Sequence, residues 1–235
     1  MSDDTRHDLR PGVETRVAGQ RYPGYDVLAK RDTPSWNDAT RRAVAARLAV
    51  SRTPRFLGAA EFRCLEALCD RVTPQETKGA DAIPVAALID HKLTLGQRDG
   101  YRSASMPPEG QAWRFGLQAL DAEAKARSSR SFAELSANEQ DDLIRAMENG
   151  DLHHDAWQGM PSAAFFRERV LPDVTHAYYS HPRAWSEVGW GGPASPRGYV
   201  RMGFDRRDPW EPVELPAGAG AEDAERVRGA NRRVR

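Results

Sequence analysis

The sequence has no long apolar run, no excess of charge of either sign, and only two cysteines. No apolar stretch approaches the ~18 to 20 residues that a membrane-spanning helix needs, so we expect no transmembrane segment. The 34 basic and 34 acidic side chains cancel. A chain without net charge creates no global positive field that would concentrate nucleic acid or anionic lipid, so we expect no nucleic-acid partner.

The two cysteines, Cys64 and Cys69, lie five residues apart on what the pattern predicts to be one helix. A helix holds residues at this spacing on different faces, so the two thiols cannot form a disulfide with each other. Two cysteines also make no metal framework. We interpret both as small apolar side chains, with Cys64 closer to the rim of the buried face.

The common cofactor motifs are missing as well. The sequence has no phosphate-binding loop, no Gly-x-Ser-x-Gly elbow and no Cys-x-x-Cys-His haem attachment. The only close glycines near a plausible dinucleotide motif are Gly218 and Gly220, and no strand precedes them. We therefore predict no catalytic residue, no metal ligand and no cofactor on this chain.

The N-terminal residues are charged and polar, without the apolar stretch of a secretory signal or a twin-arginine motif followed by one. The first 30 or so residues contain Gly, Pro and Arg without a period, which predicts an irregular arm. The last 20 or so, from Pro216 onward, have the composition of a disordered tail.

The segments between these ends have helical periodicity. Ser35 to Asp38 is a variant of the capping box, and it predicts a first helix ending near Leu48. Four further segments carry apolar residues at spacings of three and four, as expected for one buried face of a helix. Their apolar residues are Phe62, Leu65, Leu68, Cys69 and Val72; Val85, Leu88, Ile89 and Leu93; Trp113, Leu117, Leu120 and Ala124; and Leu143, Ile144 and Met147.

Two local signals refine the C-terminal half of this helical region. Ser136 and Glu139 form a capping box, and Gly150 stands where a helix would end. Pro161 begins a last long helix that reaches Tyr178, with a bend expected at Pro172 because proline removes a backbone donor.

The predicted fold class is all-α, a single helical domain of about six helices, because no segment alternates with a period of two. The domain organisation that we predict has four parts. They are an irregular N-terminal arm (1–32), the helical domain (33–182), an extended aromatic docking segment (183–215) and a disordered tail (216–235).

The segment 183–215 is rich in aromatic residues among glycines and prolines, which forbid a long helix. So many rings must be buried, either by wrapping over the chain's own helices, by docking on another protein, or by both. Glycines that let backbones approach closely suit a docking turn. The predicted partner interface comprises Trp185, Trp190, Gly191, Gly192, Tyr199 and Trp210.

Histidines offer an alternative hypothesis, a metal- or ligand-binding helical enzyme. His153 and His154 stand between two aspartates, and His176 precedes a pair of tyrosines. A metal site requires ligands that converge on one point, and adjacent residues on a helix point apart. These three residues could form a site only if the tertiary structure gathered them.

Five blocks, read in order, resemble the gluconate 2-dehydrogenase subunit 3 family. The similarity covers roughly residues 56 to 205, and the Gly191-Gly192 pair resembles a Gly-Gly turn of that family. Pro193 follows where the family usually has Asn, which suggests a divergent branch. The blocks are Phe62–Pro74, Gly79–Leu93, Trp113–Ala124, Phe132–Met147 and Phe165–Pro182.

The resemblance implies a non-catalytic small subunit that accompanies a large flavoprotein of the glucose-methanol-choline oxidoreductase type, often with a cytochrome c subunit. FAD and catalysis would belong to the large subunit. Family members commonly carry a twin-arginine signal, which this N-terminus lacks. We therefore expect a periplasmic location by co-export with a signal-bearing partner, with a cytoplasmic complex as the alternative. A helical adaptor unrelated to redox chemistry is a further alternative.

Overall fold

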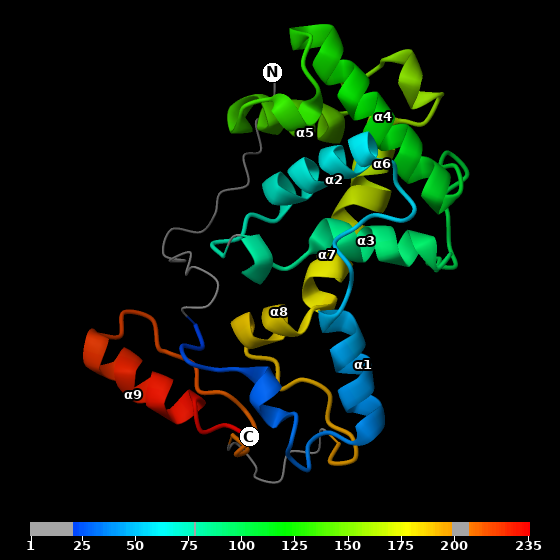
Figure 1. Ribbon diagram of the computed structural model, residues 1–235. Coiled ribbons are helices and arrows are strands. Elements are labelled where there is room, and N and C mark those ends of the chain that lie inside the picture. The colour runs from blue at the N-terminus through cyan, green and yellow to red at the C-terminus, as the bar shows by residue number, and fades with distance from the viewer. Residues whose placement is uncertain (1–20, 78, 199–206) are drawn as a thin grey trace. The chain divides into compact units, whose positions relative to one another are not determined.

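The structure is a computed structural model, and it describes residues 21–77, 79–198 and 207–235 (Figure 1). Helices dominate these residues, and no β-strand occurs among them. An isolated backbone bridge joins Trp36 to Ser195. The predicted all-α class is confirmed. No helix among the described residues has the length and apolar character to cross a bilayer.

The chain divides into two compact units, which do not follow the predicted domain boundaries. The central unit comprises residues 46–181. The terminal unit combines residues 1–45 with residues 182–235, so it is built from the two ends of the chain.

The central unit contains the helices that the apolar periodicity predicted, coloured cyan to yellow in Figure 1. The four long ones begin and end within a few residues of the predicted positions. The elements are α2 (Ala59–Val72), η2 (Gly79–Asp81), α3 (Val85–Thr94), α4 (Glu109–Ser128), η3 (Phe132–Glu134), α5 (Ala137–Asn149), η4 (Asp155–Trp157), α6 (Ser162–Phe165), η5 (Phe166–Val170) and α7 (Leu171–Ser180).

Capping interactions set several of these boundaries. The Ser136 amide donates to Glu139 Oε2 at 2.8 Å, which is the predicted capping box at the start of α5. Gly150 ends the same helix in the left-handed region, with φ of 85°, where a Cβ would be strained. Both predictions are confirmed.

The predicted irregularity near Pro172 takes the form of a π-helical turn. Residues Phe166–Val170 are π-helical, and the Leu171 amide donates to the Phe166 carbonyl. Proline has no amide hydrogen, and its ring clashes with the carbonyl four residues earlier in a regular helix. A wider turn just before Pro172 accommodates both constraints, so α6, η5 and α7 follow one another without a break.

The core of the central unit is centred on Trp113 and Phe165. Both rings are fully buried, and their centroids lie 5.4 Å apart in an edge-to-face arrangement. A Cβ on Gly116 would lie 2.2 Å from Phe165 Cζ, so this glycine is what lets the ring lie against α4. Cys64 and Cys69 are free and buried, so placing Cys64 near the rim was wrong. Burial raises the pKa of both thiols.

Among the described residues, the terminal unit contains fewer helical elements than the central unit. Its elements are η1 (Val27–Lys30), most of α1 (Asp38–Leu48), α8 (Pro182–Glu187) and α9 (Ala221–Asn231). The first long helix begins at Asp38, three residues after the predicted cap, because Asn37 accepts the Thr40 amide at 2.9 Å.

Three expectations for the chain ends do not agree with this structure. The predicted arm contains η1, whose Val27 and Lys30 are fully buried. The predicted extended segment begins with a helix, α8. The prediction of disorder after Pro216 is wrong for α9, which buries Val227 and Asn231. Its low hydrophobicity concealed it, because the helix depends on only a few buried contacts rather than on an apolar stripe.

Candidate functional site

Five charged side chains from separate elements meet inside the central unit. Lys92 of α3 is at the centre, and its Nζ lies 2.8 Å from Asp99, 2.7 Å from Glu109 and 2.9 Å from Asp173. Asp99 belongs to the loop between α3 and α4, and Glu109 is the first residue of α4. Arg169, from the π-helical turn, contacts Asp99 at 2.8 Å. We call these five residues the charged cluster.

Asp173 ties this cluster to the apolar core. Its side chain is completely buried, and Oδ2 accepts a hydrogen bond from Trp113 Nε1 at 2.7 Å. Each of its two oxygens therefore has a partner, since Oδ1 accepts from Lys92. A buried carboxylate without such partners would be strongly unfavourable.

Mutual pairing sets the protonation states of the cluster. Burial alone would lower the pKa of Lys92, but hydrogen bonds to the three carboxylates outweigh it and raise that pKa above its ordinary value. For Asp99, burial is likewise outweighed by hydrogen bonds from Lys92 and Arg169, and its pKa is lowered. Both shifts favour the charged form, the ammonium of Lys92 and the carboxylate of Asp99.

The three carboxylates also form the one group with metal-ligand spacing among the described residues, with oxygen atoms within 4.8 Å of one another. The Lys92 ammonium, however, is within hydrogen-bonding distance of all three. A divalent cation would have to displace this ammonium. The arrangement thus fits an internal ion-pair network better than a metal site.

Two cavities adjoin the cluster on the surface of the central unit. One, of about 570 Å³, is lined by Asp99, Glu109 and Arg169 together with the α3–α4 loop, including Tyr101. The other, of about 410 Å³, is lined by Lys92, Asp173 and His176. The charged cluster therefore forms part of the wall of both cavities.

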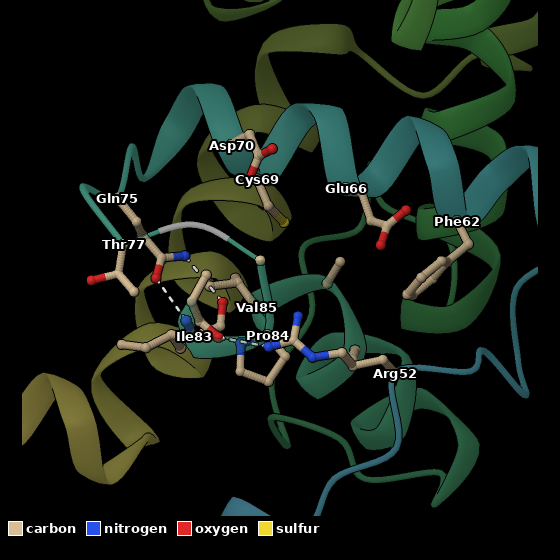
Figure 2. Close-up of a pocket in the computed structure, with 14 residues that line it drawn as sticks. Arg52, Phe62, Glu66, Cys69, Asp70, Gln75, Thr77, Ile83, Pro84 and Val85 are labelled. Carbon is tan, nitrogen blue, oxygen red and sulfur yellow. Dashed lines mark hydrogen bonds between the residues drawn. The ribbon is translucent and has the colours of Figure 1, made fainter.

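A third cavity, of about 310 Å³, lies between α2 and the start of α3 (Figure 2). Gln75 braces its rim, since its amide nitrogen donates to the Ile83 carbonyl at 3.0 Å and its oxygen accepts the Ile83 amide at 2.7 Å. Figure 2 shows Glu66 pointing from α2 toward Arg52, beside the Phe62 ring. Burial and the neighbouring Asp70 raise the pKa of Glu66.

The predicted interface residues belong to the terminal unit, where the structure separates buried from exposed ones. Trp185 is 3% exposed, whereas Trp190 is 40% exposed. Their rings meet edge to face, with centroids 4.7 Å apart. Gly192 is buried, and a Cβ there would lie 2.6 Å from Val27 Cγ2. Trp185 and Gly192 therefore pack within their own unit, while Trp190 remains partly available to a partner.

A buried lysine organises the same segment. Lys30 is fully buried, and its Nζ donates to the carbonyls of Gly191 and Trp210. The half-buried ring of Trp210 is covered by the Arg197 guanidinium, 4.0 Å from the ring centroid. Tyr199, also predicted at the interface, lies outside the described residues.

The structure does not gather the histidines of the alternative hypothesis. His153, His154 and His176 are exposed, and none belongs to the metal-spaced group found among the described residues. His154 caps η4 by accepting the Ala156 amide at 3.1 Å.

Comparison with known proteins gives one match. The family model described as gluconate 2-dehydrogenase subunit 3 matches residues 59–192, more than half of the 235 residues. The chain belongs to the gluconate 2-dehydrogenase subunit 3 family. Searches of curated proteins and of solved structures found no match.

The family match begins at the first residue of α2 and ends at Gly192. It therefore contains the charged cluster, α8 and Trp190, but neither η1 nor α9. Sequence reasoning had missed the cluster. The one sequence signal for the cluster was a charged residue on an otherwise apolar helix face, such as Asp173 beside Val174. That signal does not show which residue pairs with Asp173.

Proposed function

We propose that this chain is a non-catalytic accessory subunit of an FAD-dependent sugar or alcohol dehydrogenase complex, and that it supports assembly, stability or export of the flavoprotein subunit. The observation that carries this proposal is the family match over residues 59–192. FAD and the chemistry would belong to a large partner of the glucose-methanol-choline type, which in this family is often accompanied by a cytochrome c subunit.

The geometry of the central unit supports a structural role. The cluster residues are paired with one another, and the pKa values of Lys92 and Asp99 are shifted toward their charged forms. Catalytic acids and bases need pKa values near the working pH instead. The exposed tryptophan at position 190 and the neighbouring Val188, which is 45% exposed, supply an apolar contact for a partner.

The test is isolation of the native complex through a tag on this chain, followed by identification of its polypeptides and flavin. We expect a large flavoprotein that carries the FAD, and we expect this chain alone to have no flavin absorbance and no sugar- or alcohol-oxidising activity. Stoichiometric flavin on the isolated chain, or a complex without any flavoprotein, would contradict the proposal.

Trp190 provides the sharper test of the interface. Truncating an aromatic anchor at an interface costs roughly 2 kcal/mol or more, so Trp190→Ala should weaken partner binding at least about tenfold. The matched control is Tyr101→Ala, which removes an 83% exposed ring from the central unit. If the control weakens binding and Trp190→Ala does not, the interface is on the central unit.

We place the complex in the periplasm, by co-export with a signal-bearing partner. The test compares the export of a reporter fused to this chain with and without the partner, and export that depends on the partner supports this proposal. Export of the lone fusion would contradict this location mechanism.

A further inference from the structure

Helix α9 separates its charges along its length. Its first half carries Glu222, Asp223 and Glu225, whereas residues 226–235 contain five arginines and no acidic residue. Arg226 pairs with Asp223 at 2.6 Å, and Arg228 pairs with Glu225. These two ion pairs neutralise only two of the five arginines, so the second half keeps an excess of positive charge.

The remaining three arginines are Arg232, Arg233 and Arg235, which we call the basic end. All three are exposed, and no carboxylate among the described residues forms an ion pair with them. Positive charge is also favourable here because the last turn of a helix carries the negative end of its dipole.

The backbone beneath these arginines is held firmly. Asn231, 1% exposed, donates to the carbonyls of Pro23 and Val213 at 3.0 Å each and accepts the Val213 amide at 2.6 Å. Val227 and Val234 are buried on either side of it. The basic end is therefore presented from an ordered platform, which reduces the entropy lost when a partner binds.

We propose that the basic end is a docking surface for a carboxylate-rich patch on the partner flavoprotein. This inference rests on the proposed function, since it names a second contact with the same partner. Guanidinium groups bind carboxylates through two parallel hydrogen bonds, which suits an acidic protein surface. Because α9 lies outside the family match, this contact would be specific to the complex of this chain.

An anionic membrane suits the surface less well. A helix that lies on a membrane inserts an apolar face, but Val227 and Val234 are already buried in the terminal unit. Clusters that bind anionic lipid by charge alone typically contain about four to eight basic residues, and the basic end has fewer unpaired ones.

The experiment measures the Kd of the purified partner for the full chain. The variant Arg232→Gln, Arg233→Gln, Arg235→Gln should raise Kd at least about tenfold at low salt and flatten its salt dependence. The matched control is Arg226→Gln with Arg228→Gln, which removes two charges that the same helix already pairs; its Kd should change less than about twofold.

Salt dependence of the wild-type complex gives a reading that needs no variant. Raising ionic strength from about 0.05 to about 0.5 M should weaken binding, because exposed charges are screened. A salt-independent Kd, or a triple variant that binds like wild type, would overturn the docking surface. If the wild-type chain forms no complex at all, the proposed function itself fails. A different result would favour a membrane as the occupant. In that case the wild-type chain would bind phosphatidylserine vesicles, the triple variant would not, and both would bind the partner with equal affinity.

Discussion

The two units accommodate a lysine side chain in different ways. In the central unit, Lys92 contacts three carboxylates, among them the fully buried Asp173. In the terminal unit, the buried Lys30 donates to backbone carbonyls and has no carboxylate within ion-pair distance among the described residues. Hydrogen bonds to carboxylates raise the pKa of Lys92, whereas burial lowers the pKa of Lys30.

The two units also differ in how their apolar side chains are packed. The central unit packs long helices through apolar stripes around Trp113 and Phe165. The terminal unit assembles short elements from both chain ends around Trp36 and Trp185, and Asn231 hydrogen bonds fasten α9. In the central unit, we therefore expect substitutions of exposed residues to change stability little. Substitutions at a few deeply buried positions should lower it strongly. Four predictions test this comparison.

The largest effect is expected for Asp173→Ala. The change removes a buried ion-pair partner of Lys92 and leaves Trp113 Nε1 without an acceptor. Removing one partner of a buried pair typically costs about 3 to 5 kcal/mol. Urea unfolding measures the loss. Asp142→Ala is the control, because its pair with Arg145 is exposed and should contribute less than about 1 kcal/mol. Equal effects of the two changes would show that the cluster is not the structural centre.

The second prediction concerns pH and the terminal unit. Burial and the positive charge of Arg197 lower the pKa of Lys30 from 10.5 to about 8, and the negative charge of Glu211 opposes this shift only in part. Between these values the unfolded chain binds the proton and the folded chain has released it, so stability rises with pH, by up to about 3 kcal/mol. Below pH 8 both states are protonated and this contribution stays constant.

Hydrogen exchange of α9 amides across pH 7 to 10, compared with Lys30→Met, isolates this contribution. The variant removes the titrating group, so the difference between wild type and variant should grow in favour of wild type as pH rises. A constant difference would mean that Lys30 keeps its charge through this range.

A third, smaller effect is expected for Gly116→Ala. The added Cβ would lie 2.2 Å from Phe165 Cζ, and overpacking of a core costs typically 1 to 3 kcal/mol, so we expect a loss of about 2 kcal/mol. The measurement is the thermal unfolding midpoint. An unchanged midpoint would show that the core around Phe165 can relax, contrary to the contrast drawn between the two units.

The smallest effect has the opposite sign. Gly229 lies inside α9, and its added Cβ would meet only Arg233 at 3.9 Å. Replacing a helix-interior glycine by alanine favours the helix by roughly 0.5 to 1 kcal/mol. Gly229→Ala should therefore slow hydrogen exchange in α9. Faster exchange would indicate that α9 packs more tightly than its few buried residues suggest.

The parts of the fold that the sequence predicted correctly depend on local signals. Phe62 to Val72 and Trp113 to Ala124 carry a complete apolar stripe, and Ser136 with Glu139 forms a cap within four residues. Such signals need no knowledge of distant contacts. The elements η1 and α9 show no such stripe, because η1 has only four residues and α9 buries only Val227 and Asn231.

The same distinction between local and long-range signals applies to the candidate sites. The sequence alone determined the all-α class, the long helices of the central unit and the family resemblance, because periodicity and caps act over one or two turns. The charged cluster became visible only in the tertiary structure, where five residues meet: Lys92, Asp99, Glu109, Arg169 and Asp173. The same is true of the difference between Trp185, which is buried, and Trp190, which is exposed. Ion pairs between residues as far apart as Lys92 and Asp173, and packing between the two chain ends, depend on how helices come together, which no local pattern records.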